Sequence, residues 1–422
     1  MRGSRSRGGA AVGGLTAALV SVVAGLAWPE PAVAAPKPMA TWQTNGAVRA
    51  IRIADGVIYL GGDFTSLRPP GAALGTQAVA RGHAAALDAR TGRLLSWNPG
   101  VNGRVNAIAV FGQRVYLGGT FTRVGGHPRR NVAAVGRRRG HAKTWNPGAD
   151  AGVHAIALGR SGGVFLGGEF GRVGDARRHG LAKVSQTGAV AGWAPRVGQI
   201  SGSPCPPRCH PKVLALALAA GGSAVYIGGH FGTIDGVARN EAAEISAKGS
   251  PRVLAFNPDI YANANCPSCG ATETHRVYTI IPTAGRVYTC GGYWQVNGNR
   301  RSFNVSAFDP ANGRLLGSLT QQDDGDTPGC TLRHGVLYAG GHFNVAGPDC
   351  QPGHTGPCST RHHVAAFDVD RNALLSWDPS ANSAHGVFVV SHGRRIVAFG
   401  GFFTRFGGRN QQGIAVYRRG LP

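Results

Sequence analysis

Val57-Ile58-Tyr59-Leu60-Gly61-Gly62-Asp63-Phe64 decides the fold, because the chain repeats this pattern six more times. Each copy has an apolar run that ends in a glycine pair, then one variable residue and an aromatic residue. The first glycines of the further copies are Gly118, Gly167, Gly228, Gly340 and Gly400, and one copy has Cys290 in that place. The steps between copies are 57, 49, 61, 62, 50 and 60 residues. Such a period indicates a stacked or circular array, whose units cannot bury their apolar faces alone.

Aligned on the glycine pair, the copies predict four short antiparallel strands per unit. The first strand reads Val-x-Ala-Ile, as at residues 48–51 and 105–108, with the alternation of a strand. The second ends at the glycine pair, and the third is an Ala-rich run such as residues 85–87. The fourth is expected at the Trp-x-Pro segments, such as residues 97–99. Radial repetition of such units predicts an all-β fold, a seven-bladed β-propeller of four-stranded antiparallel blades.

The two ends of the repeat array complement each other. After the third strand of the last copy, at residues 414–417, only five residues remain, too few for a fourth strand. Thr41-Trp42-Gln43 precedes the first unit just as a Trp-x-Pro segment precedes most of the others. We therefore expect an N-terminal strand to complete the last blade and close the ring, which removes two exposed sheet edges.

The N-terminal segment predicts a secretory signal peptide at residues 1–34. Three arginines precede an apolar stretch at residues 10–27, and Ala32-Val33-Ala34 suits cleavage before Ala35. The sequence has no cysteine soon after the apolar stretch and no hydrophobic tail at residues 418–422. We therefore expect no lipid anchor. We expect residues 35–422 to form a single propeller domain of a secreted, extracellular and monomeric protein, with no integral membrane association.

The chain is strongly basic, with 44 Lys and Arg against 20 Asp and Glu and a net charge of +24. Such a charge attracts polyanions through a field that salt screens. The alternative is a compositional bias toward arginine that spreads charge over every face, which the lack of clustering in the sequence favours. No basic motif interleaved with aromatic residues points to nucleic acid in particular. Non-specific polyanion binding therefore stays open.

The motifs resemble those of a known family. Val225-Tyr226-Ile227-Gly228-Gly229-His230-Phe231, followed by residues 236–240 and by Phe256-Asn257-Pro258, is similar to the bacterial delta-60 repeat. Similar units occur in fungal bud-site landmark proteins, and the likeness covers essentially all of residues 35–422. The resemblance implies a secreted or surface β-propeller, generally without an assigned enzymatic activity. The apolar-Gly-Gly run is also distantly kelch-like, although the later Tyr and Trp spacing of kelch repeats is missing.

The long inserts are predicted to lie on one face. In a propeller, the connections after the second and fourth strands emerge on one face, here named the insert face. The turns after the first and third strands emerge on the other, here named the turn face, and these turns are short in every copy. The long inserts are residues 67–81, 199–212, 260–276 and 348–361. Loop length concentrated on one face is typical of a binding surface, and neutral drift of surface loops is the alternative.

The cysteines support the same face and predict disulfides in an exported protein. They are Cys205, Cys209, Cys266, Cys269, Cys290, Cys330, Cys350 and Cys358. We favour the pairs Cys290–Cys330 and Cys350–Cys358, and the other four could pair locally or between inserts. A zinc site built from those four has credible ligand spacing, but the oxidising compartment argues for disulfides instead.

Two rings of variable residues are expected near the axial opening of the insert face, because these positions differ between copies while the scaffold repeats. The first ring is the x of the first strand: Arg49, Asn106, His154, Leu214, Tyr278, Pro328 and Phe388. The second ring follows the glycine pair: Asp63, Thr120, Glu169, His230, Gly292, His342 and Phe402. From these we select as the candidate binding ring Arg49, Asp63, Asn106, Thr120, His154, Glu169, His230, Tyr278 and His342.

Some ring residues could support chemistry. Asp63 and Glu169 could serve as an acid and a base, and His154, His230 and His342 could hold a metal. The units that carry them are not all neighbours, so water-bridged pore-lining side chains are the alternative. We therefore assign no catalytic residue and no metal site.

Arginines recur before the third strand, at Arg81, Arg130, Arg178, Arg239, Arg301, Arg361 and Arg409. Such regular recurrence suggests a structural task, such as donation to loop carbonyls, more than anion binding. The Trp and Phe residues of the predicted fourth strand are likewise expected to pack between blades.

The sequence leaves two classes of function open. The first is a secreted recognition or scaffold protein that binds a glycan, a cell-envelope polymer or a protein through the insert face. The second is a propeller enzyme, either a polysaccharide hydrolase or lyase or a cofactor-dependent oxidoreductase, with a site at the axis. No nucleophile elbow, phosphate loop or nucleotide fingerprint is present, so we expect no cofactor and favour recognition.

Overall fold

The structure is a computed structural model. The residues it describes are 37–199, 210–261, 276–293, 295–298, 303–320, 325–348, 358–383, 385–419 and 421–422. The predicted signal peptide lies outside the described residues. Those residues contain strands and turns and no helix, hence no helix that could span a membrane.

Seven antiparallel sheets follow one another along the described chain. Their first strands are β2 (Val48–Ala54), β7 (Arg104–Phe111), β12 (Val153–Leu158), β18 (Lys212–Leu218), β24 (Arg276–Pro282), β29 (Gly329–Arg333) and β36 (Val387–Gly393). Their second strands are β3 (Val57–Gly62), β8 (Arg114–Thr120), β13 (Val164–Gly168), β19 (Ala224–His230), β25 (Val287–Gly292), β30 (Val336–Gly340) and β37 (Ile396–Gly401). Their third strands are β6 (Ala84–Asp88), β11 (Val132–Gly136), β16 (Leu181–Val184), β22 (Ala242–Ser246), β27 (Phe303–Phe308), β33 (Val364–Asp368) and β40 (Ile414–Tyr417).

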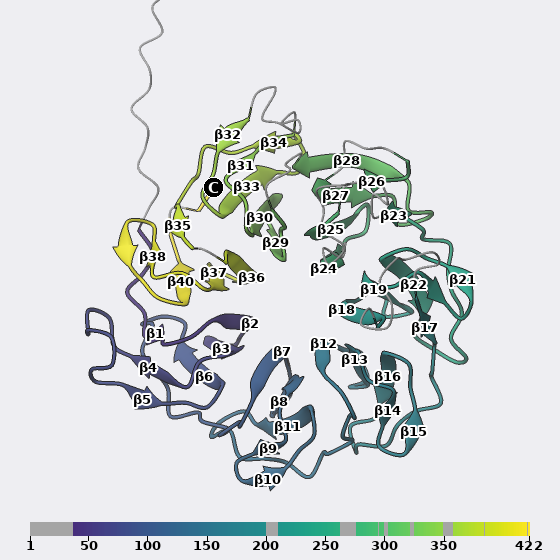
Figure 1. Cartoon of the computed structure of the whole chain (residues 1–422), viewed down its shortest axis with the longest axis horizontal. Helices are drawn as coiled ribbons and strands as arrows, with labels where there is room; N and C mark the ends of the chain where they lie inside the picture. The colour runs from purple at the N-terminus through teal and green to yellow at the C-terminus, as the bar shows by residue number, and fades with distance from the viewer. Residues whose placement is uncertain are drawn as a thin grey trace, which may run out of the picture. The chain divides into compact units, whose positions relative to one another are not determined.

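The sheets are arranged around a common axis. In Figure 1 the first strand of each sheet lies innermost, and the chain moves outward through the second and third strands. Each first strand contacts the first strand of the next sheet, and β36 of the last sheet contacts β2 of the first. This arrangement places the same position of every first strand beside the axis, which is what positions the candidate site.

The prediction of a full fourth strand in every unit was wrong for five of the seven described sheets. Only β28 (Leu315–Thr320) and β34 (Ala373–Leu374) form a fourth strand. Elsewhere a single bridge takes its place, as between Leu94 and Leu87, and it lies three residues before the tryptophan. The Trp side chain is instead used between sheets, because Trp97 donates from Nε1 to the Gly136 carbonyl of the next sheet, 3.0 Å away. The following proline has no N–H for a ladder.

Small outer sheets, which the sequence analysis missed, lie at the connections after the second and fourth segments. In six of the seven described units, a residue or short strand just before the unit pairs with a strand from the connection that follows the glycine pair. These strands are β1 (Gln43–Thr44), β4 (Ser66–Arg68), β5 (Val79–Ala80), β9 (Arg123–Val124), β10 (His127–Pro128), β14 (Arg172–Val173), β15 (Ala176–Arg177), β17 (Val197–Gly198), β20 (Thr233–Ile234), β21 (Val237–Ala238), β23 (Ile260–Tyr261), β26 (Gln295–Val296), β31 (Val345–Ala346), β32 (Ser359–Thr360), β35 (Ala381–Asn382), β38 (Arg405–Phe406) and β39 (Arg409–Asn410). Ordered backbone pairing therefore stiffens the insert face.

The glycine pair repeats because each of its members meets a different neighbour. A Cβ added to the first glycine would meet a valine of the next sheet, as Gly61 does at 2.6 Å from Val105 Cγ1. A Cβ on the second glycine would lie 2.0 Å from a backbone carbonyl, as Gly62 does with Ala47. The same valine contact recurs from Gly400 of the last sheet to Val48 of the first, at 2.7 Å. The first glycine is thus required by close packing between neighbouring sheets, and the second by the close approach of two backbone segments within its own sheet.

A left-handed residue stands just before or at the start of every third strand. In the first sheet this residue is His83, with φ 54°. Its N–H donates to the Phe64 carbonyl at 2.9 Å, and its carbonyl accepts from the N–H of Gly62 at 3.0 Å. The equivalent residues are Asn131, Gly180, Glu241, Asn304, His363 and Gly413, all with positive φ. This backbone link joins the second and third strands at the insert face.

The hydrophobic cores lie between neighbouring sheets. Tyr59 of the first sheet packs edge-on against Trp97 with ring centroids 5.2 Å apart, and both belong to a cluster that includes Val105 and Leu117 of the second sheet. The same edge-on contact recurs as Tyr116–Trp145, Phe165–Trp193, Tyr226–Phe256 and Tyr338–Trp377. The expected packing role of the Trp and Phe residues is therefore seen in the structure.

The recurrent arginines have the structural task that the sequence suggested, with two corrections of position. Arg81 donates from its two terminal nitrogens to the Ala80 and Leu95 carbonyls, which joins the start of the third strand to the fourth segment. The same pair of bonds is made by Arg178, Arg239 and Arg361. In the second sheet the donor is Arg129 and not Arg130, and in the last sheet Gln411, not Arg409, stands three residues before the third strand. Arg301 lies outside the described residues.

The structure contains the expected Cys290–Cys330 disulfide, which joins β25 of the fifth sheet to β29 of the sixth. Cys290 stands where the other sheets have their first glycine, so a covalent bond replaces the usual glycine–valine contact at this interface. Cys358 is also disulfide-bonded. The remaining cysteines, Cys205, Cys209, Cys266, Cys269 and Cys350, lie outside the described residues, and their pairing stays a prediction.

Candidate functional site

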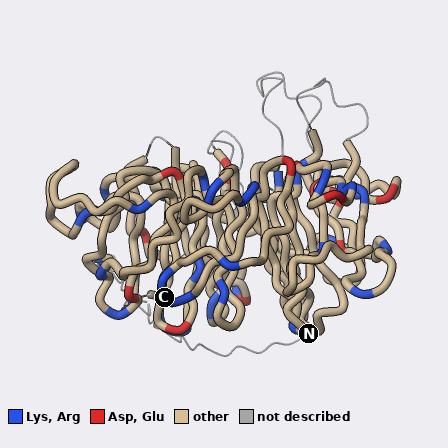
Figure 2. Tube along the Cα trace, turned by 90° about the horizontal axis from the view of Figure 1, so that it is seen from below, with Lys and Arg blue, Asp and Glu red and all other residues tan. Residues whose placement is uncertain are grey.

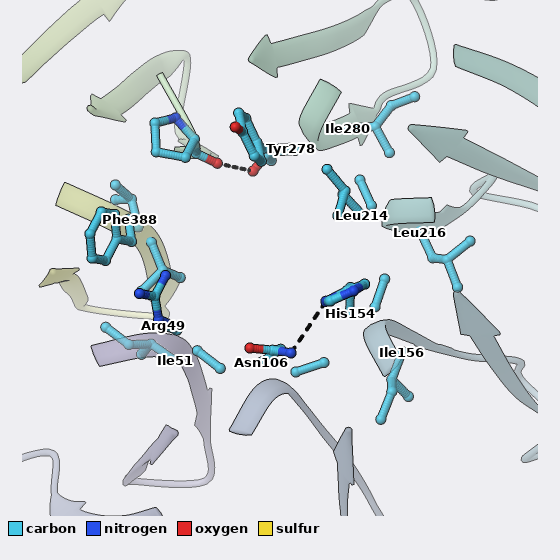
Figure 3. A pocket seen from close by; sticks show the side chains of 18 of the residues that line it. Arg49, Ile51, Asn106, His154, Ile156, Leu214, Leu216, Tyr278, Ile280 and Phe388 are labelled. Carbon is cyan, nitrogen blue, oxygen red and sulfur yellow. Dashed lines mark hydrogen bonds between the residues drawn. The ribbon is translucent and has the colours of Figure 1, made fainter. Parts of the chain in front are cut away.

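A cavity of about 510 Å³ lies at the axis, and all seven residues of the first ring line it. In six of the seven sheets this residue forms a β-bulge, because the register between first and second strands skips it, as between Val48 and Ala50. A bulged residue has no ladder partner and its side chain is turned out of the sheet. Figure 3 shows Arg49, Asn106, His154, Tyr278 and Phe388 around the same space. The repeated bulge therefore delivers unlike side chains to one place.

The cavity wall is mixed at this ring, where Leu214, Pro328 and Phe388 stand among polar residues, and apolar beyond it. Two residues further along each first strand, the lining is Ile51, Ile108, Ile156, Leu216, Ile280 and Val390. These side chains form the apolar end of the cavity, and several are labelled in Figure 3. Its volume lies in the range of small-molecule sites, roughly 300–1,000 Å³. A ligand here would meet hydrogen-bonding groups first and hydrocarbon at the far end.

Asp63 of the second ring links two neighbouring sheets. Its carboxylate accepts from Nε of Arg49 in its own sheet and from Nε of Arg104 in the next sheet. Burial opposes ionisation of this carboxyl, but the two arginines outweigh it and lower the pKa of Asp63. The Arg49 guanidinium also lies over the Phe388 ring, 4.8 Å from its centroid. Asp63 is thus an ionised group that fixes Arg49 at the cavity wall.

Glu169 has the same arrangement in the third sheet. Lys212 of the next sheet places Nζ 2.9 Å from Oε2, and His154 Nε2 lies 3.6 Å from Oε1. The nearby His154 imidazole and the Lys212 ammonium together lower the pKa of Glu169 to about 2, against the opposing effect of partial burial. Asn106 lies 3.2 Å from His154 Nδ1, a contact drawn in Figure 3. Glu169 therefore orients His154 by charge, as Asp63 orients Arg49.

The fourth sheet places a second-ring histidine against a buried carboxyl. His230 Nδ1 lies 3.3 Å from Oε1 of Glu241, the left-handed residue of that sheet. Glu241 is 1% exposed, and neither of its carboxyl oxygens has a hydrogen-bond partner. Burial raises the pKa of Glu241 well above its usual range, although the charge of Arg276 opposes this. Burial therefore favours the protonated form of this carboxyl.

A connected polar wall runs from the fifth to the sixth sheet. Arg276, Tyr278 and Asp326 all line the cavity, and Tyr278 hydrogen-bonds to both of the others. Burial and the neighbouring Asp326 raise the pKa of Tyr278 to about 12. Burial also raises the pKa of Asp326, against the hydrogen bond from Tyr278 and the charge of His342. The His342 ring stacks on His363 with centroids 6.1 Å apart. This wall offers a guanidinium, a phenol and a carboxyl to a ligand.

The structure brings the two predicted rings to different depths. The first ring lines the cavity directly. In the second ring, Asp63, Glu169 and His342 act on lining residues or their neighbours, while Thr120 is exposed and pairs with Arg104 between β7 and β8. Asp63 and Glu169 each have their own cationic partners and do not form an acid–base pair.

The three histidines proposed as metal ligands also have separate partners. His154 faces Asn106 and Glu169, His230 faces Glu241, and His342 stacks on His363. Within the ranges that the structure describes, no three His, Cys, Asp or Glu side chains are grouped to hold a metal ion. The zinc alternative at Cys205, Cys209, Cys266 and Cys269 lies outside those ranges.

A third variable position was missed by the sequence analysis. It is the residue just before the valine of the first strand, and it supplies Arg104, Lys212, Arg276 and Asp326. In the other three sheets this residue is Ala47, Gly152 and Gly386. The position varies between copies as much as the two predicted rings do. This variation between copies is the signal in the sequence that marks the position.

No protein-family model and no curated protein matches the chain. Among solved structures, the WD40 β-propeller domain of Doa1 is 8% identical, with 90% of this chain and 96% of that chain covered at a TM-score of 0.50. The computationally designed Ika8 protein is 13% identical, with 91% and 99% covered at 0.49. The extracellular domain of the putative one component system BT4673 from B. thetaiotaomicron is 10% identical, with 90% and 39% covered at 0.49. The likeness to the WD40 domain shows a propeller-like all-β fold, and at this identity it shows the fold alone.

Proposed function

We propose that the chain is a secreted recognition protein that binds a glycan, a cell-envelope polymer or a protein through its insert face, with the axial cavity as the central contact. One observation carries this proposal: seven unlike side chains, at equivalent positions of a repeated scaffold, line one cavity. A scaffold needs the same residue at the same position, so residues that differ there are free to serve contacts that differ around the ring. Among the three ligand classes, the cavity favours a glycan, because a folded protein surface cannot enter about 510 Å³.

The proposal includes seven blades closed into a ring by the N-terminal segment. Three contacts support closure. Met39 pairs with Val416 of β40, three residues before Trp42, just as Leu94 precedes Trp97. Gln411 donates from Nε2 to the Thr41 hydroxyl at 2.6 Å, in a buried position. Trp42 packs in a cluster with residues of β40 and of the first sheet. A closed ring would remove two exposed sheet edges.

The polar mouth of the cavity is suited to binding because its charges are already positioned. Arg49 and His154 are each held by a carboxylate whose own pKa is lowered, so both carboxylates remain ionised at neutral pH. Little side-chain order then has to be created when a ligand binds, which favours affinity. The Tyr278 and Phe388 rings add aromatic surface on which the C–H face of a sugar can pack.

The direct test is a binding screen of residues 35–422 against glycan and envelope-polymer arrays, repeated at high salt to separate shape recognition from charge. Asn106→Ala should lower the affinity for a ligand found in this screen about tenfold, as expected for loss of one buried hydrogen-bonding group. Asn146→Ala is the matched control, because Asn146 is exposed and lies outside the cavity lining. Equal affinities for both variants would place the ligand elsewhere and reject the cavity as the central contact.

One observation favours the alternative of a propeller enzyme. Asp326 lines the cavity beside Tyr278, and burial raises the pKa of this carboxyl, as a general acid requires. Asp63 and Glu169 lack that property because their pKa values are lowered. If a bound polysaccharide is cleaved, Asp326→Asn should remove turnover and retain binding. Turnover that survives in Asp326→Asn would exclude this acid.

Secretion is proposed from the signal-peptide pattern and is tested separately. Expression with residues 1–34 intact should yield exported protein whose N-terminus is Ala35 by mass spectrometry. Retention of the uncleaved chain in the cell would reject it. The same sample, analysed without reduction, would establish the pairing of the cysteines outside the described residues.

A further inference from the structure

We propose that the turn face carries a binding surface for a flexible linear polymer with repeating phosphate groups, centred on the turns of the second and third sheets. We name this surface the cationic sector and define it by Arg114, Arg137, Arg138, Arg139, Lys143 and Arg160. It lies on the face opposite to the inserts, so it is separate from the recognition surface proposed above. Figure 2, an edge-on view, shows Lys and Arg along the lower edge, where the chain ends.

The cationic sector has no carboxylate of its own. The turns of the second sheet are residues 111–114 and 136–143, and those of the third are residues 158–164 and 184–190. None of them contains Asp or Glu. The acidic residues of the described turn face belong to the first, fourth, fifth and sixth sheets, as Asp55, Glu244 and Asp309 do. The turns of the last sheet also lack carboxylates and carry arginines, but the turns of the second sheet carry the largest number of cations on this face.

Structural use of these cations does not neutralise them. Arg114 donates to the Gln186 carbonyl, and Arg160 donates to the Ala220 carbonyl, each in the neighbouring sheet. A carbonyl oxygen satisfies the N–H group but carries no formal charge, so the guanidinium charge remains. Arg137, which pairs with Asp55 of the first sheet, is the exception within the sector. The arginines that link neighbouring sheets therefore keep their positive charge at this surface.

Three members of the sector remain available for a ligand. Arg138, Arg139 and Lys143 are exposed, and their side chains form no hydrogen bond or ion pair among the residues that the structure describes. Consecutive arginines suit phosphate, because one phosphate can accept hydrogen bonds from two guanidinium groups. A polymer that crosses the sector would meet these three cations at the surface.

The surface fits a flexible polyanion better than other anionic partners. Single-stranded nucleic acid binds to exposed aromatic platforms, and a membrane surface is entered by apolar side chains. Phe111, at 36% exposure, is the one large hydrophobic residue counted as exposed in the described turns of the sector. A chain of phosphate groups needs neither feature, since its affinity comes from charge.

The test measures binding of fluorescently labelled inorganic polyphosphate to residues 35–422 over a series of salt concentrations. The test variant is the triple substitution Arg138→Ser, Arg139→Ser and Lys143→Ser, which breaks no side-chain bond of the described structure. The matched control is Arg130→Ser, Arg177→Ser and Arg405→Ser, three exposed arginines in connections of the insert face. Both triples remove the same charge, so they differ only in place. Melting temperatures confirm that both variants are folded.

Wild-type protein and the control triple should bind polyphosphate alike, and the test triple should bind about tenfold more weakly at low salt. The slope of log affinity against log salt should fall in magnitude by about 2 in the test triple, at roughly 0.7 for each lost phosphate contact. Equal losses in both triples would show that the net charge is responsible, and would overturn the proposal. Tighter binding to anionic vesicles or to single-stranded DNA than to polyphosphate at equal anion concentration would also overturn it.

Discussion

At the residue scale, the two glycines of each pair are required by different contacts. The structure separates them, because the first glycine faces a side chain of the next sheet and the second faces a backbone carbonyl of its own sheet. Coordinates were needed for this distinction, since both constraints give the same letter in the sequence.

This difference predicts that alanine in place of the first or the second glycine lowers the free energy of unfolding by different amounts. In Gly228→Ala the new Cβ would lie 2.5 Å from Cγ1 of Val277, a side chain that can shift, so we expect a loss of about 1–3 kcal/mol. In Gly229→Ala it would lie 2.0 Å from the Lys212 carbonyl, and the backbone itself must move, so the loss should be larger. Gly285→Ala is the control, with nothing within 4 Å. Urea unfolding of the three variants measures the order, and a larger loss for Gly228→Ala would contradict it.

The raised pKa of Glu241 predicts that its contribution to the stability of the fold decreases as pH rises. Most carboxylates have the opposite effect, because folding lowers their pKa. Because burial raises its pKa above the unfolded value of 4.5, the folded state binds this proton more tightly. Its contribution is most favourable below pH 4.5 and decreases as pH rises toward the folded pKa, by up to about 1.4 kcal/mol per pH unit. Glu241→Gln removes this titration without changing the left-handed backbone.

We therefore expect Glu241→Gln to be more stable than the wild type at pH 7, with the difference disappearing below pH 4.5. Asp175→Asn, at an exposed carboxyl on the same face, is the control for removal of one carboxyl group. Thermal unfolding between pH 3 and pH 8 gives the comparison. If the variant is instead less stable at pH 7, Glu241 is ionised and forms a stabilising ion pair with His230.

At the element scale, the first three strands of each sheet could be predicted from the sequence, and the fourth could not. Alternation and the glycine pair mark the first two, and Ala-rich runs such as residues 84–86 mark the third. Repetition of the Trp-x-Pro motif predicts a strand. The motif recurs instead because its tryptophan packs between sheets, as Trp97 does against Tyr59, and hydrogen-bonds to the next sheet. The first-ring residues were found because they vary, yet the β-bulge that directs them to the cavity has no signature in the sequence.

The interface between the fifth and sixth sheets predicts a dependence on oxidation. Here Cys290 replaces the first glycine and Thr327 stands at the position of the usual valine, so the disulfide to Cys330 substitutes for the packing found elsewhere. Reduction of this bond should cost about 2–4 kcal/mol, the typical value for a disulfide.

The double substitution Cys290→Gly and Cys330→Ile restores the residues that other copies carry at these positions. Addition of a reductant during urea unfolding should then lower the stability of the variant much less than that of the wild type. A response of equal size would show that the bonded Cys358, or a pair outside the described residues, carries the oxidation dependence.

At the scale of the whole molecule, the proposed closure depends on a short N-terminal segment. Deletion of residues 35–44 would remove the Met39–Val416 bridge, the Thr41 hydroxyl that accepts from Gln411, and the Trp42 side chain packed on β40. We expect a loss of about 3–5 kcal/mol, comparable to truncation of a large buried side chain together with an unpaired buried polar group. Deletion of residues 35–38 alone leaves all three contacts and serves as the control. Equal melting temperatures for both deletions would show that the segment does not complete the last sheet and would reject the closed ring.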